Sequence, residues 1–216
     1  MPVATAFDAV SWGHDPGEIK AAGLSVALHY TGNALPSADY IATLVAAGIG
    51  VILIQESIPE RALQGYAAGV ADGQFAATRV DSVGIADWAT IALCVSDNNA
   101  NTPSGAAAAI AIRAYVQGFS DACGNHGIAP YGNRFAVDAG RDVAKVRWTW
   151  VPSTWYANET DGMWQMANLD SPLANSDLDW ILIPLDQLGA WGLTEVQDMT
   201  DAQAAQLQKV SDFIDY

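Results

Sequence analysis

Basic residues, cysteine and histidine are scarce in this 216-residue sequence. Nine Lys and Arg stand against 24 Asp and Glu, which gives a formal net charge of −15. This charge would repel a phosphate backbone, and no basic run is interleaved with aromatics, so no nucleic acid partner is expected. Cys94 and Cys123 are expected to be buried thiols, although a disulfide is left open. The three histidines are far apart and lack cysteine partners, so we expect neither a metal site nor another cofactor.

Long apolar runs are also missing. No run reaches the roughly 18 residues of a membrane helix, so membrane insertion is not expected. The first residues, Met1 to Thr5, lack the basic and apolar regions of a signal peptide. We therefore expect a protein that stays in the cytoplasm until lysis releases it, or one that is associated with a virion. No G-x-S-x-G elbow, phosphate loop or G-x-G-x-x-G fingerprint supports a hydrolase triad, an NTPase or a dinucleotide enzyme.

Short apolar runs alternate with alanine-rich amphipathic stretches, which is the βαβ pattern of a parallel sheet. The sequence predicts an α/β fold with one (β/α)8 TIM-type barrel over residues 1–192. Its last third is expected to be irregular, because 152–178 contains no good helix pattern. The predicted strands are 4–9, 24–30, 50–55, 90–96, 128–131, 146–151, 163–166 and 179–183, and the predicted helices are 16–22, 37–47, 59–77, 104–124 and 134–144.

Residues 193–216 form a separate C-terminal extension in this prediction. Thr200 can cap a polar helix in which Leu207, Val210 and Ile214 follow three-four spacing. The helix could dock on the barrel or could begin an oligomerising coiled coil. It is thus the expected contact for another copy of the chain or for a virion partner.

Four acidic residues lie at the ends of apolar runs and are the candidate catalytic groups: Asp8, Glu56, Asp97 and Asp179. Carboxylates at the carboxyl ends of barrel strands are typical of (β/α) enzymes, and glycosidic bonds are cleaved by pairs of them. Structural alternatives remain open for each. Asp8 could cap a helix or pair in a loop, Glu56 could pair with Arg61, Asp97 could stabilise a turn, and Asp179 could bind loop backbone.

Aromatic and amide side chains near the same strand ends are candidate substrate-binding groups. Trp150 and Trp155 could stack on a pyranose face, and Tyr30 and Gln165 could add hydrogen bonds. Tryptophan is more often a packing residue, so about two of the eight in the chain are expected to line a binding site.

Several segments, in order, resemble one known family. They are Phe7-Asp8, the run from Leu28 to Asn33, Ile54-Gln55-Glu56, Arg61 to Asp72, Tyr131-Gly132, Trp164 to Asn168 and Asp177-Leu178-Asp179. Over about residues 5–192 the chain resembles glycoside-hydrolase-like barrels of unknown function, related to family 25 muramidases and found in actinobacteria and their phages. The resemblance implies a barrel whose acidic residues bind, and in muramidases cut, the glycan of peptidoglycan. Asp8, Glu56 and Asp179 match its acidic positions.

The fourth strand departs from the family pattern. Relatives end it with two acids separated by one residue, and muramidases use the second as general acid, whereas this chain has Ser96-Asp97-Asn98. Serine and asparagine cannot donate a proton as a carboxylic acid does. Two hypotheses follow: a muramidase-like hydrolase of cell-wall glycan, with Glu56 as leading acid and Asp8 or Asp179 as partner, or an inactive glycan-binding or virion structural barrel.

Overall fold

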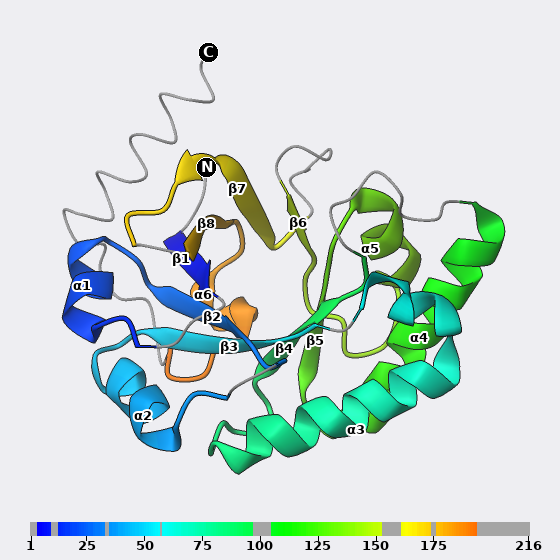
Figure 1. Cartoon of the computed structure of the whole chain (residues 1–216), viewed down its shortest axis with the longest axis horizontal. Coiled ribbons are helices and arrows are strands. Elements are labelled where there is room, and N and C mark those ends of the chain that lie inside the picture. Colours follow the sequence, from blue (N-terminus) through cyan, green and yellow to red (C-terminus); the bar gives the residue numbers. More distant parts are fainter. Residues whose placement is uncertain are drawn as a thin grey trace.

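The computed structural model of the chain is a closed eight-stranded barrel with helices packed around part of its outer face (Figure 1). It describes residues 4–9, 13–32, 35–56, 58–96, 105–152, 161–173 and 176–193. The strands follow one another around the barrel in chain order, which confirms the predicted TIM-type fold. Two predicted site residues, Asp97 and Trp155, lie outside the described residues, as does the predicted C-terminal helix from 194 onward.

The strand bounds agree closely with those predicted for the first five strands. The strands are β1 (Ala4–Ala9), β2 (Val26–Tyr30), β3 (Gly50–Gln55), β4 (Thr90–Cys94), β5 (Gly127–Tyr131), β6 (Trp150–Pro152), β7 (Met163–Asp170) and β8 (Ser176–Ile181). The helices are α1 (Pro16–Ala21), α2 (Ala38–Ala46), the 3-10 helix η1 (Pro59–Gln64), α3 (Tyr66–Ser82), α4 (Ala106–Ala122), α5 (Arg134–Gly140) and α6 (Leu185–Leu188). The single helix predicted over 59–77 is wrong: η1 and α3 are separated at Gly65, whose φ of 72° interrupts the helical backbone.

The last strand runs against its neighbours. β1 to β7 are parallel where they pair in sequence order, but β8 pairs antiparallel with both β7 and β1. The expectation of a wholly parallel sheet is therefore wrong for β8. The residues between β7 and β8 connect adjacent ends of two strands, so no crossover helix is needed there. This reversal places the amino end of β8 beside the carboxyl end of β1.

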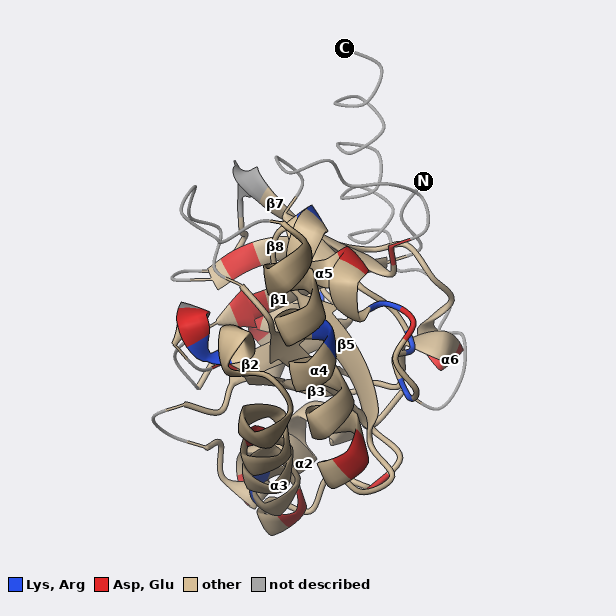
Figure 2. Ribbon diagram, turned by 90° about the vertical axis from the view of Figure 1, so that its right-hand side faces the viewer, with Lys and Arg blue, Asp and Glu red and all other residues tan. Residues whose placement is uncertain are grey.

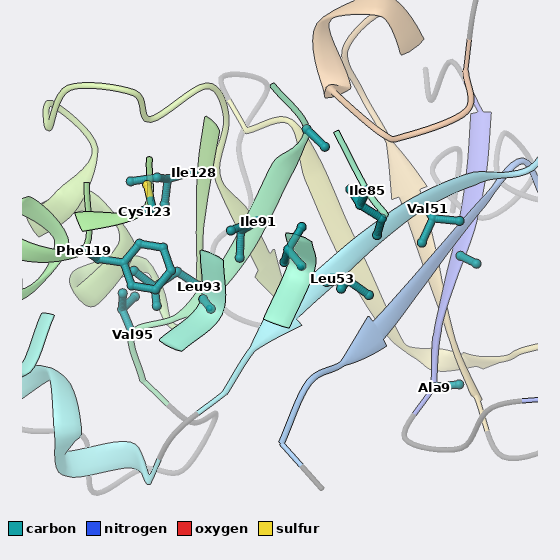
Figure 3. Close-up of a cluster of buried hydrophobic side chains, with 14 of the residues drawn as sticks. Ala9, Val51, Leu53, Ile85, Ile91, Leu93, Val95, Phe119, Cys123 and Ile128 are labelled. Atoms are coloured by element: carbon teal, nitrogen blue, oxygen red, sulfur yellow. The ribbon is translucent and has the colours of Figure 1, made fainter. Parts of the chain in front are cut away.

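Successive side chains of each strand point alternately into the barrel and out toward the helices, and this produces two buried layers. One side of each strand fills the barrel, with Ala4 and Ala6 of β1 and Ile52 and Ile54 of β3 among its interior residues. The other side packs outward against the helices, and Figure 3 shows part of that layer, including Val51, Leu53, Ile91, Phe119 and Cys123. The two cysteines are buried and free, so the disulfide is not formed.

Helix α6 closes the amino-terminal end of the barrel. The carbonyl of Leu188 accepts hydrogen bonds from the indole N–H of Trp148 at 2.8 Å and the hydroxyl of Thr90 at 2.9 Å. The opposite, carboxyl-terminal end of the barrel is therefore the end that a ligand can reach more easily. In the described part of the chain, no helix is both long and apolar enough to span a membrane.

Candidate functional site

A cluster of polar side chains lies inside the barrel, contributed by β1, β2, β5 and β6 and by β7 and β8, which close the barrel. Asp8 continues the inward-facing series of Ala4 and Ala6, so its carboxyl group points into the mouth of the barrel. Tyr30 ends β2. Asp177 pairs in register with Asp8, and residues directly opposite each other in an antiparallel pair lie on the same face.

Gln165 of β7 holds this cluster together. Its amide nitrogen Nε2 donates to Asp8 Oδ2 at 2.8 Å and to Asp177 Oδ2 at 3.4 Å. Its amide oxygen accepts from the Tyr131 hydroxyl at 2.9 Å. The two carboxylates fix which end of the amide faces them, because an amide oxygen cannot donate to a carboxylate, and the amide oxygen is then free to accept from Tyr131. Gln165 therefore positions two carboxyl groups from the neighbouring strands β1 and β8.

Asp8 is buried, with 3% of its surface exposed. Besides Gln165, the Tyr30 hydroxyl donates to its Oδ1 at 3.2 Å. Burial raises the pKa of Asp8 to about 6, the two donors oppose that rise, and the nearby charge of Asp177 adds to it. Asp8 therefore changes protonation state near neutral pH, which suits acid-base chemistry.

Asp179 is fully buried beside Asp8. The Trp150 indole donates to its Oδ1 at 3.0 Å, while no N–H or hydroxyl group of the described residues donates to Oδ2. Burial, together with the charges of Asp8 and Asp177, raises the pKa of Asp179 well above its ordinary value. The carboxyl groups of Asp179 and Asp8 also share a hydrogen bond, which requires a proton on one of them. The two acids thus form a proton-sharing pair.

Glu56 follows β3 and is exposed at the same end of the barrel. Partial desolvation raises the pKa of its carboxyl group. Burial raises the pKa of Tyr30, and the charges of Asp8, Tyr131, Glu56 and Asp179 add to that rise, which places Glu56 near the cluster. Its alternative partner, Arg61, is bound instead to Asp72 at 2.9 Å.

After the fourth strand there is a structural contact at a position where the family resemblance predicts an acid. Ser96 is buried, and its hydroxyl accepts a hydrogen bond from the backbone N–H of Asn133 at 2.9 Å. A Cβ atom added to Gly132 would lie 2.4 Å from the same hydroxyl oxygen. Ser96 therefore anchors the loop after β5, and there is no space beside it for a side chain at position 132.

Trp150 lies inside the barrel and is fully buried. Its ring lies 4.0 Å from that of Tyr131, centroid to centroid, and its indole N–H binds Asp179. The contacts that the structure shows are thus with other site residues, and a role in stacking on a sugar stays a prediction. Tyr30 and Gln165 each donate a hydrogen bond to Asp8, and their role in substrate binding also stays a prediction.

Two members of the cluster, Asp177 and Tyr131, are absent from the predicted site residues. Asp177 could have been found, because it precedes Asp179 by two residues and the alternation of a strand puts both on one face. Tyr131 ends an apolar strand, and only the fold brings it to Gln165. Within the described residues, no three His, Cys, Asp or Glu side chains are grouped as metal ligands.

Comparison with known families then identifies the fold. Residues 17–210 match the model of the Rv2525c-like, glycoside hydrolase-like domain. The chain belongs to this family. The resemblance predicted from the sequence is confirmed, and the match continues past residue 192, where the prediction ended the barrel. No curated protein matches the chain.

Solved structures support the same fold. The Tat-secreted protein Rv2525c of Mycobacterium tuberculosis, solved in complex with L-tartrate, superposes with a TM-score of 0.72 at 19% identity, over 88% of this chain and 99% of that one. The spore cortex lytic enzyme SleM of Clostridium perfringens has a TM-score of 0.56 at 14% identity, over 86% and 69%. The catalytic domain of endolysin ply40, from bacteriophage P40 of Listeria monocytogenes, has a TM-score of 0.55 at 10% identity, over 90% and 98%.

Proposed function

We propose that this protein is a glycoside hydrolase that acts on the peptidoglycan of bacterial cell walls. The observation that carries the proposal is the convergence of carboxyl groups with raised pKa at the carboxyl end of the barrel. Glycoside hydrolysis needs one carboxyl group that is protonated near neutral pH and a second one close by. The lytic enzymes of similar fold support peptidoglycan as the substrate.

Exposure assigns the roles within the cluster. A general acid must touch the leaving oxygen of the substrate. Glu56 is the exposed member with a raised pKa, so it is the proton donor in this proposal. Asp8 is the partner carboxylate, because it lies at the mouth of the barrel and its pKa of about 6 allows ionisation. Asp179 is fully buried and supports Asp8 through their shared proton.

A second candidate is an inactive barrel that binds cell-wall glycan or builds part of a virion. Ser96 favours this candidate. It occupies the position after the fourth strand where the family resemblance predicts an acid, and its hydroxyl is already bound to the backbone N–H of Asn133. The same polar cluster would then serve recognition only. The two candidates differ in whether a bond is broken.

The deciding experiment is reducing-sugar release from purified actinobacterial cell walls by the wild type, Glu56→Gln and Asp8→Asn. Both substitutions keep the size of the side chain and remove its acid-base function. The hydrolase proposal predicts release that both variants abolish. No release, together with sedimentation of the intact protein with the walls, would support the binding barrel instead.

The place of action is also proposed. The relative Rv2525c is a Tat-secreted protein, and ply40 comes from a bacteriophage. Both support action of this chain outside the cytoplasm, at the cell wall, whether it arrives by secretion, by lysis or on a virion. Fractionation of producing cells and particles, with an antibody to the chain, would detect which route applies.

A further inference from the structure

Glu56, the proposed proton donor, is not fixed by a contact of its own side chain. Within the described residues no side chain binds its carboxylate, and partial desolvation is what raises its pKa. Basic positions are few on the ribbon (Figure 2), and Arg61, the nearest of them in sequence, binds Asp72 instead. The position of the Glu56 carboxylate therefore depends on the backbone that carries it, and on the contacts made just before and just after this residue.

The residue before Glu56 is anchored to the end of β2. Thr31, which directly follows Tyr30, is fully buried. Its backbone N–H donates to the carbonyl of Ile54 at 2.8 Å. Its hydroxyl lies 3.0 Å from the same carbonyl and 2.9 Å from the side-chain oxygen of Gln55. These contacts fix the carboxyl end of β3 against that of β2, and with it the placement of Glu56 relative to Tyr30.

The residues after Glu56 are anchored to α3 and α4. The guanidinium group of Arg61, in η1, donates to both carboxylate oxygens of Asp72 in α3, at 2.9 Å from Nη2 and 3.1 Å from Nε. The Tyr115 hydroxyl of α4 donates to the same carboxylate at 2.7 Å. Asp72 and Tyr115 are buried. Because bidentate, charge-assisted hydrogen bonds are strong and directional, they hold η1 against the two helices.

The two helices form a rigid support for this contact. A Cβ atom added to Gly69 would lie 2.0 Å from the backbone oxygen of Tyr115, and one added to Gly118 would lie 2.2 Å from the backbone oxygen of Tyr66. α3 and α4 thus pack backbone against backbone, which leaves neither of them room to shift toward the other. The stretch 61–72, one of those that resemble the family, begins and ends on the ion pair that holds η1 on this support.

We propose that Thr31 and Arg61 are positioning residues, which hold Glu56 where it can donate its proton to the substrate. This inference rests on the proposed function, which makes Glu56 the acid. Neither positioning residue has to touch the substrate: Thr31 acts through the end of β3, and Arg61 acts through η1. Loss of either contact would let the carboxylate move away from the leaving oxygen and become better hydrated.

The first test compares two buried hydroxyl groups in the whole chain. Thr31→Val removes the hydroxyl at Gln55 and keeps the size of the side chain. Thr90→Val is the matched control, because its hydroxyl is also buried and donates to a backbone carbonyl, that of Leu188 at the closed end of the barrel. Carbon NMR of the carboxyl groups measures the titration of Glu56. We expect Thr31→Val to lower the pKa of Glu56 toward its ordinary value, because hydration removes the desolvation that raises it, and Thr90→Val to leave it unchanged.

The second test makes the same comparison for the other anchor. Arg61→Ala removes the ion pair with Asp72, and the control Arg113→Ala removes an exposed one with Asp142 on the surface. The pKa of Glu56 should again fall in the test variant alone. In both test variants we expect the maximal rate of sugar release from cell walls to fall by up to about 100-fold, with little change in the amount of wall that gives the half-maximal rate.

An unchanged Glu56 titration in either test variant would overturn the role of the residue replaced, whether or not the wild type releases sugar. An equal fall of the Glu56 pKa in a test variant and its control would show a general loss of stability and would also overturn the proposal. No sugar release by the wild type, together with the expected shifts in titration, would overturn the proposed function while supporting the placement of Glu56 by these two residues.

Discussion

Asp8 and Asp179 lie on adjacent strands that run in opposite directions, and their carboxyl groups share a hydrogen bond inside the mouth of the barrel. The antiparallel course of β8 sets Asp177 directly opposite Asp8 and sets Asp179 opposite Ala6, one inward-facing position along the strand from Asp8. In a wholly parallel barrel, Asp177 in the first half of β8 would lie toward the closed amino end, away from Asp8. The reversal of one strand therefore brings Asp177 to the acidic pair.

Asp8 makes folding stability depend on pH. Its folded pKa of about 6 exceeds its ordinary value of 3.8, so the folded state binds its proton more tightly than the unfolded state. This contribution is fully present below pH 3.8 and is lost as pH rises through about 6. Its size is at most roughly 3 kcal/mol at about 1.4 kcal/mol per pH unit. Urea unfolding of the wild type and of Asp8→Asn at a series of pH values measures it as the difference between the two curves. Parallel curves would contradict the prediction.

Substitution of Gln165 by leucine tests its role in positioning the acids. The change removes donors to Asp8 and Asp177 and an acceptor for Tyr131. We expect a loss of roughly 2 kcal/mol in the free energy of unfolding. The pKa of Asp8 should also rise above its present value, because the Gln165 hydrogen bond lowers it.

Carbon NMR of the carboxyl groups measures that pKa. Gln117→Leu is the matched control, because its amide nitrogen likewise donates to a carboxylate, that of Asp121, at the surface and away from the site. We expect the control to leave the Asp8 titration unchanged. An unchanged titration in Gln165→Leu as well would show that Gln165 does not act on the acids.

Ser96→Ala tests the anchoring of the loop after β5. The buried N–H of Asn133 would lose its acceptor, so we expect a loss of about 1–2 kcal/mol in the free energy of unfolding. Thermal or urea unfolding measures the loss. Ser82→Ala removes an exposed hydroxyl that donates to the backbone carbonyl of Arg79 and should change stability by less than about 0.5 kcal/mol. Equal losses in the free energy of unfolding for the two substitutions would mean that the Ser96 hydrogen bond contributes no more to stability than an exposed one.

Local patterns predicted the barrel and three of its acidic residues because strand periodicity and the position of a charge after an apolar run are local properties. The direction of β8 cannot be predicted from its own residues, because the alternation of apolar and polar residues is the same whether a strand runs parallel or antiparallel to its neighbours. The sequence therefore did not predict the pairing of Asp177 with Asp8. The interruption at Gly65 was also missed, because the apolar spacing continues through it. The burial of Trp150 depends on neighbouring strands, which no single segment encodes.

The central claim is that this barrel cleaves a glycosidic bond with Glu56 as the acid. Its most direct test is mass spectrometry of the soluble products from purified peptidoglycan after incubation with the wild type and with Glu56→Gln. The account predicts glycan fragments with new hexosamine reducing ends from the wild type and none from the variant. Intact peptidoglycan after wild-type treatment, or the same fragments from Glu56→Gln, would contradict it.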